Sequence, residues 1–195
     1  MKNLKLVLLL VTGFCLLTAC EKNVHYWGDD SPGNTLKNGP ETSLLITVPL
    51  KGDFTVVPEA MMPDETYEEY GFKLIMAGDG TMSHLGKMTT RMIFWAEGGP
   101  VGPYGYGSGT FVAANGDELY FEFDEGLIVW NEKENADFYL TRFNDPIQFS
   151  GGTGRFEGAT GSMMSNAFVH YPDPNVEGDF WHTDFFSYGT LTMEK

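Results

Sequence analysis

Cysteine is almost absent from this chain of 195 residues, and its placement excludes several kinds of chemistry. The two cysteines, Cys15 and Cys20, lie close together near the start of the sequence. The rest of the chain can therefore form no disulfide, no CxxC redox pair and no cysteine nucleophile. Its stability must come from packing, and Phe, Tyr, Trp and Met are plentiful enough for one domain with a sizeable core.

Basic residues are also scarce. Lysine and arginine number 12 against 27 aspartates and glutamates, which gives a formal net charge of -15 at pH 7. Removal of residues 1–19 would take Lys2 and Lys5 away, and 10 basic against 27 acidic residues leave -17. Nucleic acids and anionic lipid headgroups are bound through basic patches, so no nucleic-acid partner and no headgroup binding are expected.

The apolar run at the start of the chain is too short for a membrane-spanning helix. It extends from Leu6 to Leu17, whereas a span needs about 18 apolar residues. Lys2 and Lys5 precede it, and Leu17-Thr18-Ala19-Cys20 follows it as a lipobox. This order is typical of a bacterial lipoprotein signal peptide, so we expect cleavage after residue 19 and a diacylglyceryl group on Cys20.

Lipidation of Cys20 would decide where the protein resides and how it meets the membrane. The acyl chains of a mature lipoprotein hold a domain at a membrane surface without a spanning segment. The sequence thus predicts a lipid-anchored protein of the bacterial cell envelope, at the outer membrane. Its membrane partner would be bound through the lipid on Cys20. Residues 20–41 contain few apolar residues and many turn formers, which predicts a flexible tether.

Residues 42–195 lack the sustained 3.6-residue apolar period of a long helix. Runs of β-branched and aromatic residues alternate instead with Gly, Asn and Asp. Eight strands are predicted near residues 43–57, 70–78, 82–96, 107–114, 117–130, 138–150, 159–170 and 181–193. Short connections favour an antiparallel meander, so the expected fold is all-β, a single eight-stranded antiparallel closed β-barrel. Its interior would be filled by side chains or hold one small ligand.

Three local patterns refine this expectation. Asn115-Gly116 predicts a two-residue hairpin turn that pairs Ala114 with Asp117 and places Phe111 opposite Tyr120 on the wetter face. Pro and Gly in residues 97–107 and 171–179 predict long loops without ladder pairing. Nine methionines of the predicted domain suit either core filling or a pliable apolar cavity.

The run Gly151-Gly152-Thr153-Gly154-Arg155-Phe156-Glu157-Gly158-Ala159-Thr160-Gly161 resembles the signature turn of the allene oxide cyclase and dirigent-like β-barrel superfamily. Residues 83–87 and 113–119 are similar to bacterial lipoprotein members of it in the same order. The resemblance spans roughly residues 75–193 and implies an eight-stranded antiparallel barrel with an inner cavity. The plant members steer a reactive intermediate in that cavity, but no segment here matches their catalytic residues, so none is transferred. Phe156 is expected to plug the barrel end.

Candidate site residues come from polar side chains within this framework. His182 and Asp184 fall on one face of a strand, where they could form a hydrogen-bonded pair or, with His84 or His170, part of a metal site. His84, Tyr120, Arg155, His182 and Asp184 are the predicted ligand contacts. No catalytic residue, metal ligand set or cofactor is assigned, since Gly107-Ser108-Gly109 is no nucleophile turn and no DxDxDG calcium loop occurs.

The leading functional expectation is non-catalytic binding of a small apolar or amphipathic molecule in the barrel. One alternative is a cyclase-like or isomerase-like enzyme that uses His84 or His182 as acid and base. Another is a structural or adhesive surface module with a filled barrel. The state of the barrel interior discriminates between a binding role and a purely structural one.

Overall fold

β-Strands account for nearly all the regular structure of residues 44–195, which are the residues that the computed structural model describes. The strands are β1 (Leu45–Pro63), β2 (Phe72–Met82), β3 (Gly86–Ala96), β4 (Gly102–Ala113), β5 (Glu118–Phe123), β6 (Gly126–Trp130), β7 (Thr141–Gly152), β8 (Thr160–His170) and β9 (His182–Glu194). A three-residue 3-10 helix, η1 (Gly154–Phe156), follows β7. In this part of the chain no helix is long and apolar enough to cross a membrane. The predicted signal peptide, Cys20 and the tether lie outside the described residues.

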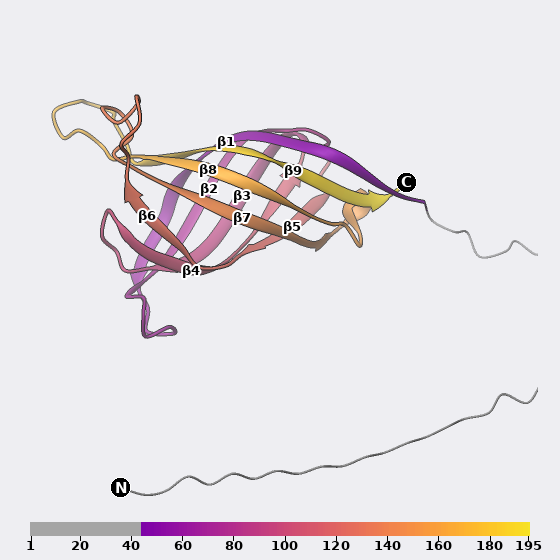
Figure 1. Cartoon of the computed structure of the whole chain (residues 1–195), viewed down its shortest axis with the longest axis horizontal. Coiled ribbons are helices and arrows are strands. Elements are labelled where there is room, and N and C mark those ends of the chain that lie inside the picture. Colours follow the sequence, from indigo (N-terminus) through magenta and orange to yellow (C-terminus); the bar gives the residue numbers. More distant parts are fainter. Residues whose placement is uncertain (1–43) are drawn as a thin grey trace, which may run out of the picture. The chain divides into compact units, whose positions relative to one another are not determined.

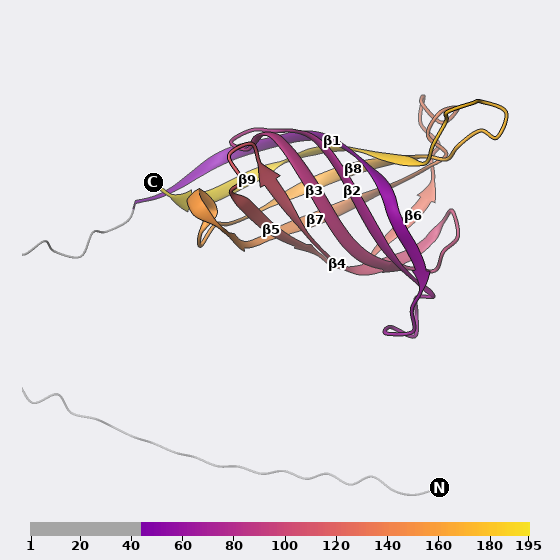
Figure 2. The same cartoon turned by 180° about the vertical axis from the view of Figure 1, so that it is seen from behind.

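The strands close into an eight-stranded antiparallel barrel, as predicted (Figures 1 and 2). Pairing runs β3-β2-β1-β9-β8-β7, and β3 also pairs with β4. The remaining position, between β7 and β4, is shared by two short strands. β5 pairs with Gly107–Val112 of β4, whereas β6 pairs with Gly102–Tyr104. The predicted strand 117–130 is therefore interrupted between β5 and β6, which explains how nine strands occupy eight positions.

Alternation along each strand places one set of side chains in the barrel interior. In β1, for example, Leu50, Gly52, Phe54 and Val56 are buried, while the alternate residues Lys51, Asp53 and Thr55 are exposed. Side chains of a strand alternate between the two faces of a sheet, so this pattern fills the inside of the barrel with apolar groups. Closure leaves no long unpaired edge in the sheet.

One end of the barrel is closed by buried side chains, and we call it the plugged end. Its connections are the turns 83–85 and 114–117 and the segment 153–159 that contains η1. Phe156 of η1 has no exposed surface, which agrees with the plug predicted for it. Leu85, Leu119 and Leu191 are also buried in the barrel core. Leu45 pairs with Glu194, so the described chain enters and leaves the barrel at this end (right in Figure 1).

The opposite end, which we call the mouth, carries the longer connections. They are the loops 64–71, 97–101, 131–140 and 171–181, which gather at the left in Figure 1. The predicted loop 171–179 is confirmed, whereas the predicted loop 97–107 ends earlier because β4 already begins at Gly102. A Cβ on Gly107 would lie 2.0 Å from the ring of Phe123, so glycine here allows that ring to lie across the neighbouring strand.

The predicted register of the Asn115-Gly116 hairpin is wrong by one residue. Phe111 pairs with Leu119, not with Tyr120, and both residues are fully buried. The amide of Gly116 donates to the carbonyl of Ala113, and Gly116 has a φ of 90°. The loop therefore has three residues, with Gly in the left-handed position of a bulge, and the extra residue turns Phe111 into the core.

Candidate functional site in the barrel cavity

The mouth half of the barrel encloses a cavity of about 310 Å³. Its wall is mainly apolar and draws on every strand of the barrel. Aromatic rings contribute through Phe94, Tyr104, Phe123, Phe143 and Phe185, and thioethers through Met61, Met76 and Met92. Residues of the mouth loops, among them Pro100, Tyr171 and Trp181, complete the lining. This size lies at the lower end of the range for pockets that hold small organic molecules.

A single carboxyl group lies on this apolar wall. In β7 the inward positions are Phe143, Asp145, Ile147 and Phe149, so Asp145 occupies a place that strand alternation reserves for an apolar residue. Its side chain is only 3% exposed, and the hydroxyl of Tyr104 donates a hydrogen bond to its Oδ1. A buried carboxyl needs such a partner because burial without one is costly.

Burial controls the protonation of this pair. It raises the pKa of Asp145 to about 7, although the hydrogen bond from Tyr104 acts in the opposite direction by favouring the carboxylate. Burial also raises the pKa of the Tyr104 phenol, and the neighbouring Asp145 raises it further, so Tyr104 stays protonated. The cavity thus contains one carboxyl group that can gain or lose a proton near neutral pH.

Asp145 belongs to a row of buried polar side chains that crosses three neighbouring strands. Asp145 of β7 pairs in register with Ser165 of β8, and Ser165 pairs with Ser187 of β9. The hydroxyls of the two buried serines lie 2.6 Å apart and form a hydrogen bond. Ile147, one inward position beyond Asp145 toward the plugged end, is buried and does not line the cavity. Asp145 is therefore the innermost lining residue of β7, and the cavity extends from it toward the mouth, while Ser165 and Ser187 lie outside the lining.

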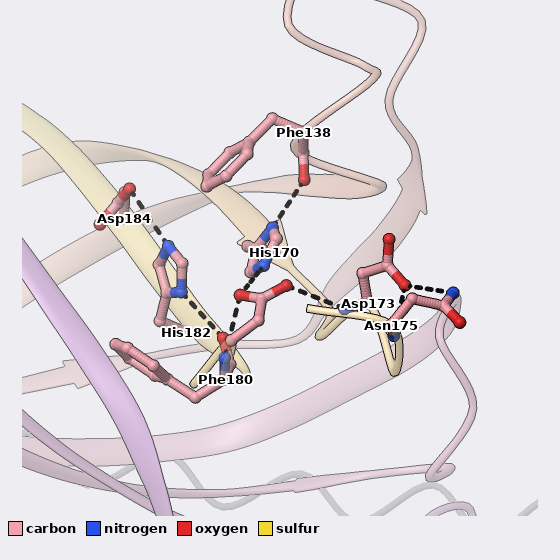
Figure 3. Close-up of polar contacts among 8 residues, drawn as sticks. Phe138, His170, Asp173, Asn175, Phe180, His182 and Asp184 are labelled. Atoms are coloured by element: carbon pink, nitrogen blue, oxygen red, sulfur yellow. Dashed lines mark hydrogen bonds and ion pairs between the residues drawn. The ribbon is translucent and has the colours of Figure 1, made fainter. Parts of the chain in front are cut away.

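The mouth loop 171–181 is fastened by a histidine at the end of β8 (Figure 3). His170 Nδ1 lies 2.9 Å from the carbonyl oxygen of Phe138, and its Nε2 lies 2.6 Å from Asp179 Oδ1. Both partners are acceptors, so the ring satisfies both only as an imidazolium that donates from each nitrogen. Burial lowers the pKa of His170, but these hydrogen bonds outweigh it and the net pKa is raised.

Asp179 completes the fastening from within the loop. Its carboxylate accepts hydrogen bonds from the backbone amides of Asp173, at 2.8 Å, and Phe180, at 2.9 Å. The amide of Asp173 and the side chain of His170 lower the pKa of Asp179. Asp179 is therefore an anion that ties the two ends of the loop together and holds them against β8. Tyr171 and Trp181, which flank this loop, stack at 5.6 Å and line the cavity.

His182 and Asp184 lie on one strand face, as predicted, but they are too far apart for the predicted hydrogen bond. His182 Nε2 lies 3.8 Å from Asp184 Oδ2, and Tyr139 donates a hydrogen bond to the same oxygen. The rings of His182 and His170 lie 4.7 Å apart, so His170 does converge on the pair. Within residues 44–195, however, no three His, Cys, Asp or Glu side chains form a group that could hold a metal ion.

The five predicted ligand contacts all lie outside the cavity lining. His84 and Arg155 are at the plugged end, where His84 bonds the Pro49 carbonyl and Arg155 lies 3.7 Å from Asp117. Tyr120 lies on the outer face of β5 and donates to Glu118. His182 and Asp184 lie beside the mouth, but on the outer face of β9.

The sequence interpretation missed Asp145 and Tyr104, the polar pair of the cavity. Tyr104 fell in the predicted loop 97–107, so no inward direction was assigned to it. Asp145 fell in a predicted strand, and its phase relative to Ile147 and Phe149 could have identified it as an inward acid. No family model matches this chain, and no curated protein matches its sequence.

Proposed function

We propose that this protein is a lipid-anchored envelope protein that binds a small apolar or amphipathic molecule inside its barrel, without covalent chemistry. The observation that carries the proposal is the cavity of about 310 Å³, with apolar walls and very few polar groups. Apolar walls supply affinity and a few fixed polar groups supply orientation, which is the usual composition of a small-molecule site. Anchoring through Cys20 is the part of the proposal that rests on the sequence.

Cavity filling provides a sharp test of the proposal. Val56 and Val57 are neighbours on β1, but Val56 lines the cavity and is 1% exposed, whereas Val57 faces outward and is 37% exposed. Val56→Trp should fill the cavity, and Val57→Trp is the matched control of the same chemistry. Overpacking costs about 1–3 kcal/mol, so circular dichroism should confirm that both variants are folded.

The readout is native mass spectrometry of full-length protein purified from its own envelope. We expect a small copurifying molecule with the wild type and with Val57→Trp, and its loss with Val56→Trp. If the wild type carries no small molecule and also fails to bind apolar probes, the binding function is refuted. The structural-module alternative would then be favoured.

A cyclase-like or isomerase-like enzyme is the second candidate, because one cavity group suits acid–base chemistry. His84 and His182 do not line the cavity, so neither would reach a molecule bound there. Asp145 does line it, and its pKa of about 7 suits proton transfer near neutral pH. If the copurifying molecule is converted by wild type but only bound by Asp145→Asn, the enzyme candidate replaces pure binding.

A further inference from the structure

We propose that the ligand of this cavity is an organic cation, an apolar molecule that bears a protonated amine, with Asp145 as its counter-ion. This inference rests on the proposed binding function and names its ligand class. Three independent features of the described residues support it: the buried carboxyl, the aromatic rings around it, and the charge of the mouth.

The first feature is the sign of the charges inside the cavity. Asp145 has the one carboxyl group among the lining residues, and none of them is Lys, Arg or His. A carboxylate ligand such as a fatty acid would therefore find no positive partner and would face Asp145 directly. A protonated amine would form a charge-assisted hydrogen bond with Asp145 in an apolar environment, where such bonds are strongest.

The second feature is the set of rings next to this carboxyl. The ring of Tyr104, whose hydroxyl bonds Asp145, lies 5.2 Å from Phe143, 6.1 Å from Phe94 and 6.3 Å from Phe123, measured between centroids. All four rings line the cavity. Aromatic faces attract cations, and a group of rings combined with an anion is a recurrent way of binding organic ammonium groups.

The third feature is the acidic character of the mouth. Each of its four loops presents exposed carboxylates, for example Glu65, Glu97, Glu134 and Asp173. Lys133 is the only Lys or Arg in these four described loops. A rim of one charge sign raises the local concentration of ligands with the opposite charge and speeds their entry. An acidic rim leading to an internal carboxyl favours cations along the whole path.

Three probes with one carbon skeleton test the assignment: phenylpropylamine, phenylpropanol and phenylpropanoate. We would titrate each into the purified full chain by calorimetry at about pH 8, where Asp145 is ionised and the amine is protonated. The amine should bind about tenfold or more tightly than the alcohol. The carboxylate should show no measurable binding.

Two variants connect this preference to Asp145. In Asp145→Asn the affinity for the amine should fall to that for the alcohol, while the affinity for the alcohol stays unchanged. Glu157→Gln removes an exposed acid at the plugged end and should leave all three affinities as in wild type. If Asp145→Asn does not fold, the pH dependence of the wild type replaces it. Affinity for the amine should then rise between about pH 5 and pH 8, and affinity for the alcohol should not.

The outcomes separate the two proposals. Equal binding of the amine and the alcohol by wild type, or an amine preference that survives in Asp145→Asn, would overturn the cation assignment and leave the binding function intact. Tighter binding of phenylpropanoate than of phenylpropylamine would also overturn the cation assignment and leave the binding function intact. Binding of none of the three probes would refute the cavity-binding function as well.

Discussion

Replacement of Asp145 by Asn should change how the stability of the protein depends on pH. In the folded protein burial raises the pKa of Asp145 from 3.8 to about 7. Between these values the unfolded chain loses the proton while the folded protein keeps it. A group with a raised folded pKa therefore contributes a free energy of unfolding that falls as pH rises from about 4 to about 7 and is constant above that range.

The magnitude follows from the two pKa values. A pKa difference of one corresponds to 1.36 kcal/mol, so a rise from 3.8 to about 7 corresponds to about 4 kcal/mol. Asn cannot ionise, but its carbonyl oxygen can still accept the hydrogen bond from Tyr104. Asp145→Asn should therefore match wild type near pH 4 and exceed it by up to about 4 kcal/mol at pH 8.

Urea unfolding followed by tryptophan fluorescence at a series of pH values measures this difference. The comparison uses the gap between variant and wild type, because contributions of all other titrating groups cancel in it. Glu157→Gln, an exposed acid at the plugged end, should give a curve parallel to that of wild type. A gap that stays constant from about pH 4 to about pH 8, or a less stable Asn variant at pH 8, would refute the assigned burial of Asp145.

Three further predictions concern the loop, the plug and the anchor. The pKa of His170 is raised above its ordinary value of 6.5, so the fastening of loop 171–181 is complete below pH 6.5 and is lost as pH rises through the raised pKa. Protection of that loop from amide exchange should fall over the same pH range, and Asp179→Asn should cause the same loss of protection at low pH. Unchanged protection in both experiments would contradict the role of His170. Phe156→Ala should lower the free energy of unfolding by about 3–5 kcal/mol in urea titrations while the cavity at the other end keeps its probe affinities, and a loss of affinity in folded protein would show that the two ends are coupled. Cys20→Ser should release the protein from membranes into the soluble fraction on centrifugation, and persistent sedimentation with membranes would argue against the lipid anchor.

The barrel itself could be predicted because its strands carry strong local patterns. Strands β7, β8 and β9 begin and end within a few residues of the predicted 138–150, 159–170 and 181–193. The register of β4 against β5 was harder to predict, since a loop of two or of three residues is equally compatible with the Asn115-Gly116 pair. Only the packing of Phe111 against the core selects the longer loop, and packing is a property of the whole barrel.

The residues that line the cavity were harder to predict than the barrel. Sequence candidates such as His84 and His182 stood out because histidine is chemically versatile, yet the structure places them on outer surfaces. Asp145 was overlooked because an acid in a strand is usually solvent-exposed. Glycine weakens strands, so the sequence of residues 102–107 predicts a loop, but at Gly107 the ring of Phe123 occupies the space that a side chain would take.

The pairing of Leu45 with Glu194 has a practical consequence for handling the protein. The amide of Lys195 also donates to the carbonyl of Leu44, so both ends of the described chain leave from the side remote from the opening. A tag or sensor-chip linkage attached after Lys195 would present the opening to the bulk solution. Immobilised protein could thus be screened against soluble compounds without the support obstructing their access.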